Sequence, residues 1–252
     1  MSVAVQGGVR VERVDDRAAL ARAAAEEVVR LAAEAVDGRG TFTLALAGGS
    51  TPAALYRLLA DPGAPYRDRV RWPAVHAFFG DERAVPPDHP DSNYRMARSA
   101  LLDQVALASV HRIRGELGAV AAAREYEAEL RAHFGSAGFP AFDLMLLGLG
   151  ADGHTASLFP GSPALLERSR WAADAPGPPP ARSRVTLTAP VLEAARAVLF
   201  LVAGADKAGA LRRWVKPRPG EEPVPAARIR FGAVPRVLAD AEAAAGLESP
   251  AT

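Results

Sequence analysis

The sequence predicts an α/β fold in which helices cover both faces of a mostly parallel sheet. Short apolar runs of strand length alternate with longer helical patterns along the 252 residues. Several of these runs are continuously apolar, as expected for parallel strands that are covered on both faces. No repeat of fixed period and no extended low-complexity tract breaks the alternation. We therefore expect a single doubly wound, three-layer domain that spans residues 1–252.

The predicted elements follow one another in a regular order. Strand-like runs lie at residues 9–14, 42–47, 75–79, 142–147, 184–188, 197–202 and 236–239. Helical patterns alternate with them, at residues 17–36, 53–60, 93–105, 119–133, 205–215 and 240–245. The proline-rich stretches at residues 176–180 and 217–225 are short and flanked by this same pattern. We interpret them as surface loops rather than domain linkers.

Composition excludes several classes of protein. A formal net charge of +1 is not that of a strongly basic nucleic-acid-binding surface or an acidic tail. The absence of cysteine excludes disulfides and thiolate metal sites. The first 16 residues lack the apolar core of a secretory signal, and the apolar stretch at 197–203 is far shorter than the roughly 20 residues that span a bilayer. We expect a soluble cytoplasmic protein with no nucleic-acid or membrane partner.

A glycine turn follows the second predicted strand, with the sequence Gly48-Gly49-Ser50-Thr51-Pro52. The glycines allow a tight turn and a close approach of the backbone to a ligand. Ser50 or Thr51 suits the N-cap of the next helix, and Pro52 suits its first position. Such a helix N-terminus binds phosphate well, although an ordinary capped turn is the alternative. No lysine follows the glycines, so this is not a nucleotide-binding P-loop.

A cluster of charged residues, Asp81-Glu82-Arg83, follows the third predicted strand. The guanidinium of Arg83 could bind a phosphate through its fixed fork of donors. Asp81 and Glu82 could orient that arginine or bind sugar hydroxyls, and a local salt-bridge or turn role is equally open. Ser92 is predicted to be the N-cap of the following helix.

The loop after the fourth predicted strand contains Gly148, Gly150 and Gly153 in the Gly-x-Gly-x-x-Gly spacing of dinucleotide-binding proteins. That fingerprint should open a long helix, but Pro160 and Pro163 leave room for barely two turns. No strand that ends in an acid appears at the expected distance either. We therefore do not expect a nicotinamide cofactor.

The same loop presents Asp152 and His154 at the edge of the sheet. Histidine is the side chain best suited to proton transfer near neutral pH, and the carboxylate could fix its tautomer. A histidine that only hydrogen-bonds within the loop is the alternative. A metal site has little support, because one histidine and one aspartate have no second pair of ligands at helical spacing.

Two late cations complete the set of candidate site residues. Arg184 starts a predicted strand, and Lys207 lies near the predicted N-terminus of a helix. A cation is slightly disfavoured there unless an anion lies nearby, so Lys207 is a candidate contact for an anionic ligand. A solvated surface lysine is the alternative.

Together these segments resemble the 6-phosphogluconolactonase family. The matching pieces, in family order, are LALAGGSTP (44–52), FFGDERAVPPDHPDSNYRMA (78–97), DLMLLGLGADGHTASLFPG (143–161), RVTLTAP (184–190) and VAGADKA (202–208). The Asp-Gly-His-Thr-Ala-Ser-Leu-Phe-Pro run is the most specific of them. The sequence departs from the family at Ala84, where an aromatic residue is common, and at residues 235–245, a looser version of the closing strand and helix. These departures concern the pocket wall rather than a proposed catalytic atom.

The resemblance implies a fold similar to that of the sugar-phosphate isomerases and lactonases, and a metal-independent hydrolase without a cofactor. The implied reaction opens 6-phospho-D-glucono-1,5-lactone to 6-phosphogluconate in the oxidative pentose phosphate pathway. His154 would activate the attacking water and then protonate the ring oxygen, with Asp152 orienting or tuning the imidazole. The substrate would be the only partner of a monomer or small homo-oligomer. Its binding residues would be Gly48, Gly49, Ser50, Thr51, Asp81, Arg83, Arg184 and Lys207.

Two other functions are weighed against this one. In glucosamine-6-phosphate deaminase/isomerase, an Asn-Glu-Pro element follows the histidine and its glutamate serves a proton relay. Here Ser157-Leu158-Phe159-Pro160 follows, and the next acid is Glu167. A non-catalytic sugar-phosphate-sensing domain is usually attached to a helix-turn-helix. The N-terminal segment offers one long helical pattern without a second helix, and His154 is retained.

Overall fold

The computed structural model describes residues 3–6, 8–178 and 183–247, so the end of the proline-rich stretch at 176–180 lies outside the described residues. Within them, the main sheet has the strand order β1-β2-β11-β10-β7-β3-β4-β6. Every neighbouring pair is parallel except β1 with β2. The strands are β1 Val3–Gln6, β2 Val9–Arg13, β3 Phe42–Leu46, β4 Val75–Phe79, β6 Ser109–Val110, β7 Leu144–Leu147, β10 Val198–Val202 and β11 Arg236–Ala239. This confirms the predicted α/β fold with a mostly parallel sheet.

A second, smaller sheet is antiparallel, in the order β5-β9-β8. Its strands are β5 Asp81–Arg83, β9 Ser183–Leu187 and β8 Ala172–Pro176. Only β9 was expected from the sequence. We interpreted residues 81–83 as part of a loop, because three residues are too few to show the two-residue alternation of a strand.

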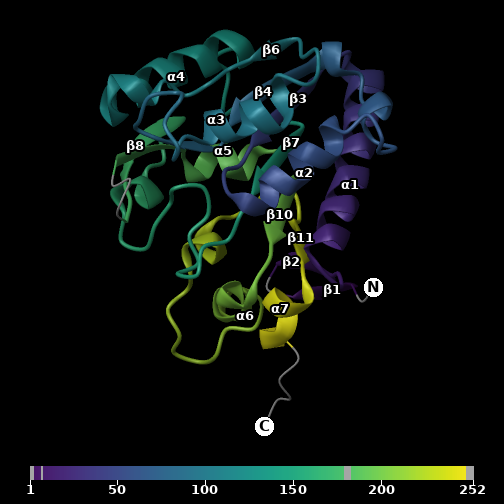
Figure 1. Cartoon of the computed structure of the whole chain (residues 1–252). Coiled ribbons are helices and arrows are strands. Elements are labelled where there is room, and N and C mark those ends of the chain that lie inside the picture. Colours follow the sequence, from purple (N-terminus) through teal and green to yellow (C-terminus); the bar gives the residue numbers. More distant parts are fainter. Residues whose placement is uncertain (1–2, 7, 179–182, 248–252) are drawn as a thin grey trace.

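The helices lie on both sides of the main sheet. Figure 1 shows α1 and α2 on one side, and α4 together with β8 and α5 on the other. The helices are α1 Arg17–Arg39, α2 Ser50–Ala60, α3 Asn93–Ala97, α4 Ala119–Phe134, α5 Ala189–Ala194, α6 Ala208–Val215 and α7 Ala241–Ala244. None of the described helices is long and apolar enough to cross a membrane.

Local sequence signals explain where the helices begin and end. Asp16 caps α1, since its Oδ1 accepts a hydrogen bond from the amide of Ala19 at 2.6 Å, and Gly40 ends the helix in the left-handed conformation with φ 80°. Ser92 caps α3, as predicted. That helix continues as a π-helical turn to Leu102, three residues short of the predicted end.

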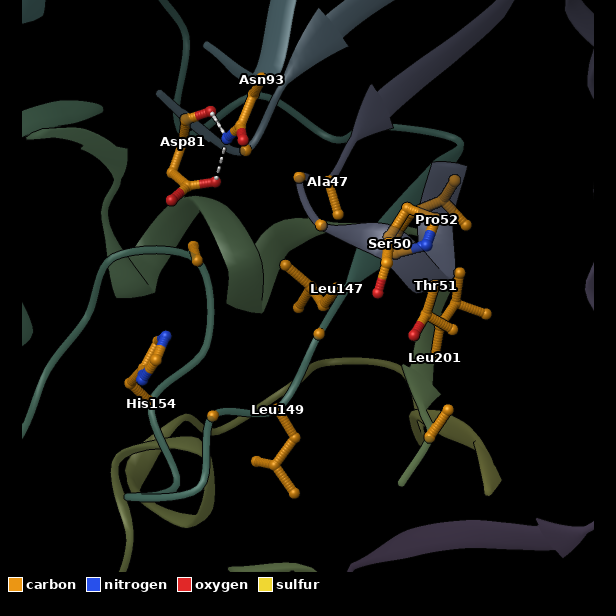
Figure 2. Close-up of a pocket in the computed structure, with 18 of the residues that line it drawn as sticks. Ala47, Ser50, Thr51, Pro52, Asp81, Asn93, Leu147, Leu149, His154 and Leu201 are labelled. Carbon is orange, nitrogen blue, oxygen red and sulfur yellow. Dashed lines mark hydrogen bonds between the residues drawn. The ribbon is translucent and has the colours of Figure 1, made fainter. Parts of the chain in front are cut away.

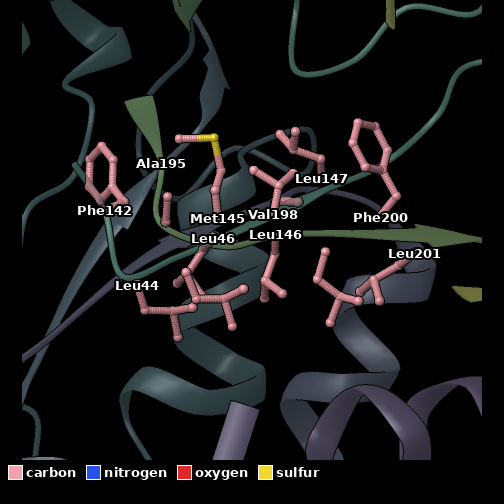
Figure 3. Close-up of a cluster of buried hydrophobic side chains, with 14 of the residues drawn as sticks. Leu44, Leu46, Phe142, Met145, Leu146, Leu147, Ala195, Val198, Phe200 and Leu201 are labelled. Carbon is pink, nitrogen blue, oxygen red and sulfur yellow. The ribbon is translucent and has the colours of Figure 1, made fainter. Parts of the chain in front are cut away.

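The core has two halves, one on each face of the sheet. In Figure 3, Leu46 and Leu146 point to one face, toward α1 and α2, and Met145 and Phe200 point to the other. All four side chains are buried. Strands that are apolar on both faces are therefore covered on both faces, which fixes the positions of the loops at their ends.

Candidate active site

A pocket lies at the point where the order in which strands are added to the sheet reverses. From β3 the next strands are added toward β4 and β6, whereas from β7 they are added toward β10 and β11. β3 and β7 are neighbours, so the loops at their carboxyl ends leave a crevice, as is usual at such a switch point. The crevice is a cavity of about 470 Å³. All the predicted site residues except Asp152 line it: Gly48, Gly49, Ser50, Thr51, Asp81, Arg83, His154, Arg184 and Lys207.

The N-terminus of α2 forms one wall of the pocket. We expected Ser50 or Thr51 to be the N-cap, but the helix already begins at Ser50 and the cap is Gly49, whose φ of 103° suits glycine. Ser50 and Thr51 are therefore the first two helical residues, and Pro52 is the third. No side chain among the described residues caps this helix. Pro52 has no N–H and the amide of Ala53 bonds to the carbonyl of Gly49, so in this turn the amides of Ser50 and Thr51 are left for an anion.

Buried polar contacts fix the glycine turn in front of α2. The hydroxyl of Tyr56 donates to the carbonyl of Ala47 and accepts from its amide, both at 2.9 Å. A Cβ on Gly48 would overlap the side chain of Asn93. In Figure 2, the hydroxyls of Ser50 and Thr51 face the space that separates α2 from His154.

Two arginines, one from β5 and one from β9, line the pocket from the small sheet. The register of β5 and β9 pairs Arg83 directly with Arg184. Side chains directly opposite each other on antiparallel strands lie on the same face, and like charges there repel. Burial lowers the pKa of Arg184, and the charge of Arg83 lowers it further. Within the described residues, the buried Nε of Arg83 has no hydrogen-bond partner. A bound anion would offset the repulsion between the two arginines and could accept a hydrogen bond from the unpaired donor.

Lys207 and Arg17 supply positive charge on the other side of the pocket. Lys207 pairs with Asp206 at 2.8 Å, and Nε of Arg17 lies 3.9 Å from Asp240. Arg17 was not among the site residues predicted from the sequence. It is the first residue of α1, which residues 14–16 connect to β2, and so it has the same signal as Lys207: a cation at a helix N-terminus beyond a strand.

Asn93, also missed, connects the acidic and the basic parts of the site. Its Nδ2 donates to Oδ1 of Asp81 at 3.1 Å, and its Oδ1 accepts a hydrogen bond from Arg83. Ser157 donates to the other carboxylate oxygen of Asp81 at 2.5 Å. Asp81 therefore holds Asn93 and Ser157 in place while it lines the pocket, and Figure 2 shows its two hydrogen bonds with Asn93.

Glu82 has a structural role. Its carboxylate accepts hydrogen bonds from the amides of Arg83, Asn93 and Tyr94 and from the hydroxyl of Ser92. Burial raises the pKa of Glu82, and these hydrogen bonds oppose the rise. Only 2% of the residue is exposed, and it does not line the pocket. Of the open alternatives for this acid, the local turn role is the one observed.

The loop of His154 is closed by its own residues. The amide of Gly150 donates to the carbonyl of His154 at 2.8 Å, and Oδ1 of Asp152 accepts from the amide of His154 at 3.1 Å. A Cβ on Gly150 would overlap the imidazole. No helix opens after Gly153 in the described chain before the short turn at Pro163–Leu166, so the dinucleotide spacing lacks the helix that it requires.

The imidazole of His154 is held between a carboxylate and an aromatic ring. Its Nδ1 lies 2.5 Å from Oδ1 of Asp152, and its ring centroid lies 4.3 Å from that of Phe159. Partial burial disfavours the charged form of Asp152, but hydrogen bonding to His154 outweighs it and lowers the pKa of the carboxyl. Because an ionised carboxylate only accepts hydrogen bonds, Nδ1 carries the proton in this pair. Nε2 then has a lone pair and can act as a base.

A strained backbone follows the histidine. Ala156 lines the pocket with a φ of 48°, the left-handed region that residues other than glycine rarely adopt. Such conformations persist where the surrounding structure holds them, often at functional sites. The site therefore combines a held imidazole with a cation-rich pocket, which suits proton transfer on an anionic substrate.

Comparisons with known proteins agree with this description. A family model described as "Glucosamine-6-phosphate isomerases/6-phosphogluconolactonase" matches residues 15–237. A 6-phosphogluconolactonase of Synechocystis is 46% identical over 206 residues, which cover 78% of this chain and 81% of the relative. A rice protein named probable 6-phosphogluconolactonase 3, chloroplastic, is 42% identical over 207 residues and 77% of this chain. The match spans 62% of the length of that rice protein.

The fold is also similar to that of solved structures. The 6-phosphogluconolactonase of Trypanosoma cruzi superposes with a TM-score of 0.83 at 32% sequence identity. The superposition covers 95% of this chain and 97% of the other. Both the parallel sheet and the small antiparallel sheet thus belong to an architecture seen before.

Proposed function

This chain belongs to the glucosamine-6-phosphate isomerase/6-phosphogluconolactonase family, and from that premise we propose that it is a 6-phosphogluconolactonase. The reaction is the hydrolysis of 6-phospho-D-glucono-1,5-lactone to 6-phospho-D-gluconate, a step of the oxidative pentose phosphate pathway. One observation carries the proposal: His154, bound to Asp152, faces the N-terminus of α2 across a pocket lined with cations. No side chain of the described residues caps that N-terminus.

In the proposed reaction, His154 takes a proton from a water molecule as the water oxygen attacks C1 of the lactone. The new C–O bond forms while the carbonyl electron pair moves onto its oxygen. When the tetrahedral intermediate collapses, the bond between C1 and the ring oxygen breaks. The imidazolium gives its proton to that oxygen, which becomes a hydroxyl. The carboxylic acid that remains ionises at neutral pH.

Asp152 keeps the imidazole in the reactive tautomer. Its hydrogen bond to Nδ1 leaves the lone pair on Nε2 and stabilises the imidazolium that forms during attack. The lactone carbonyl is itself electrophilic, so one general base suffices and the proposed steps use no metal.

The phosphate group is proposed to bind at the N-terminus of α2, across the pocket from His154 (Figure 2). The amides of the Gly48–Gly49 turn and of the first turn of α2, with the hydroxyls of Ser50 and Thr51, provide neutral donors. The side chains of Arg83, Arg184 and Lys207 provide the charge. Anchoring the phosphate holds C1 near His154, and this positioning contributes to the rate.

The test is a lactonase assay with freshly generated 6-phosphogluconolactone, corrected for spontaneous hydrolysis. The purified protein should accelerate hydrolysis, and exhaustive chelation should leave the rate unchanged. Glucosamine 6-phosphate is the control substrate, since release of ammonia from it would indicate a deaminase instead. No acceleration with either compound, together with tight binding of a sugar phosphate, would favour a sensing domain.

Three further properties are part of the proposal. We infer a cytoplasmic location, which fractionation of the source cells tests. We also infer one domain, for which a single cooperative unfolding transition is expected. A monomer or small homo-oligomer is expected by analytical ultracentrifugation.

A further inference from the structure

Three histidines meet outside the pocket, at the far end of β4. His76 is the second residue of β4, His111 directly follows β6, and His133 lies in the last turn of α4. Each offers one ring nitrogen, and these three atoms all lie within 4.8 Å of one another. His76 is about 16 Å along the strand from Asp81, at about 3.3 Å per residue, so this cluster is not part of the active site. All three residues are half-buried.

The register of the sheet brings these side chains to one face. His76 pairs with Ser109, and two residues further along the same face Phe78 lies beside His111. The ring of His111 stacks on Phe78 with centroids 4.2 Å apart and planes 6° from parallel. α4 covers this face, and the ring of His133 lies 4.9 Å from that of His76 and 5.1 Å from that of His111.

A chain of hydrogen bonds sets the tautomers of two of the three rings. Glu129 lies 2.7 Å from Nδ1 of His111, Ser109 lies 2.7 Å from Nε2 of His111, and Nδ1 of His76 lies 2.7 Å from Ser109. An ionised glutamate can only accept, so His111 donates from Nδ1 and accepts from the serine hydroxyl at Nε2. The serine oxygen then accepts from Nδ1–H of His76. This polarity leaves a lone pair on Nε2 of both His76 and His111.

His133 completes the set. Within the described residues, its imidazole makes ring contacts but no hydrogen bond, so a nitrogen is available to a ligand. The ring also lies at the C-terminal end of α4, where the helix dipole favours a cation.

We propose that His76, His111 and His133 form a binding site for a divalent transition-metal ion, with Zn²⁺ as the best fit. Three imidazoles suit zinc, copper, nickel and cobalt rather than magnesium or calcium. Glu129 is the carboxylate that orients a ligating histidine through its other nitrogen, an arrangement common at zinc sites. The fourth position would hold water, since no other donor of the described chain joins the group.

Binding requires only small movements. Nitrogens at about 2.0–2.1 Å from one tetrahedral ion are about 3.4 Å apart, so the most distant pair must close by about 1.4 Å. Rotation of the half-buried rings achieves this, and His111 exchanges the serine hydroxyl for the metal while it keeps its bond to Glu129. The bound ion would link β4, β6 and α4.

The test uses protein purified without a histidine tag and stripped of metal. Titration calorimetry with Zn²⁺ should give one ion per chain, and Zn²⁺ but not Mg²⁺ should raise Tm. Glu129→Gln should weaken Zn²⁺ affinity by about 10–100-fold, and His133→Gln or His76→Gln by more. His89→Gln and His154→Gln, which change the two other histidines of the chain, should bind Zn²⁺ as the wild type does.

Two results would overturn the proposal. One is unchanged Zn²⁺ affinity in His76→Gln and His133→Gln variants whose metal-free Tm matches that of the wild type. The other comes from imidazole nitrogen NMR of the wild-type protein, which avoids variants that fold poorly. If saturating Zn²⁺ shifts the resonances of His154 or His89 and not those of the cluster, the metal binds elsewhere. If saturating Zn²⁺ shifts none of the imidazole resonances, the histidine cluster does not bind the metal.

Discussion

The two sides of the pocket are built in different ways. His154 belongs to a loop that its own residues hold together, because Asp152 contacts its ring and Gly150 binds its backbone. Arg83 and Arg184 come from distant parts of the sequence and become neighbours only through the register of β5 with β9. The geometry of the His154 loop is set locally, whereas the pairing of the two arginines depends on tertiary structure. Substitutions on the two sides should therefore separate, with kcat affected on one and KM on the other.

The largest effect is expected on the loop, for His154→Ala. Loss of a general base should lower kcat by about 10²–10⁴-fold, and KM should change little because the phosphate contacts remain. Initial rates over a range of lactone concentrations measure both constants.

His89→Ala is the matched control for His154→Ala, since His89 is half-exposed and does not line the pocket. It should keep wild-type kcat and KM. Wild-type turnover in His154→Ala would show that another group is the base.

A change on the other side, Arg83→Ala, should chiefly raise KM. The expected increase is about 10–100-fold, because a hydrogen bond to a charged group contributes about 1.5–3 kcal/mol. Arg83→Lys should restore part of the affinity but not the fork of donors. If kcat fell and KM stayed constant in both variants, the separation of the two sides would be wrong.

Asp152→Asn should lower kcat by about tenfold, since the hydrogen bond to the imidazolium loses its charged acceptor and a hydrogen bond to a charged group contributes about 1.5–3 kcal/mol. The pKa of Asp152 lies below its ordinary 3.8 in the folded protein. Its stabilising effect is therefore present at neutral pH and is lost as pH falls through the folded-state pKa. Thermal melts should give a higher Tm for the wild type than for Asp152→Asn at pH 7, and this difference in Tm should decrease in acid. A difference in Tm that grows in acid would contradict the prediction.

The smallest effect is expected for Lys207→Ala. Lys207 already has a partner in Asp206, whose side chain is 63% exposed. Exposed pairs contribute about 0.2–1 kcal/mol, so KM should rise by no more than about fivefold. A rise that equals that of Arg83→Ala would place the phosphate near α6 rather than near β5.

The sequence predicted best what is encoded over short distances. The alternation of continuous apolar runs with helical patterns was enough for the parallel sheet, and the Ser92 cap was confirmed. Pro160 and Pro163 predicted that no long helix follows the glycines around His154, and the described chain has none there. One local signal misled us: Ser50 favours an N-cap, but Gly49 takes that position and leaves the first turn of α2 open.

Features that depend on pairing could not be predicted. β5 and β6 have three and two residues, so only their partners reveal them. The meeting of Arg83 with Arg184 needs the antiparallel register. The three-histidine cluster needs β4, β6 and α4 in place, and its members have no common spacing in the sequence. Asn93 was not predicted to be a site residue, because its neighbour Ser92 already explained the start of the helix.

The arginine pair of β5 and β9 has a consequence for how the empty protein folds. Two like charges paired in register across β5 and β9 repel each other, so the fold conflicts with electrostatics at this point, although nearby carboxylates offset part of the repulsion. A multivalent anion removes the conflict, so it acts as a folding aid as well as a ligand. Sulfate or phosphate should raise the melting temperature more than chloride at equal ionic strength, and this difference should be smaller in Arg184→Ala, where only the general stabilising effect of these anions and the other cations of the pocket remain. The pair that is proposed to bind the phosphate would then make the empty protein less stable than the occupied one.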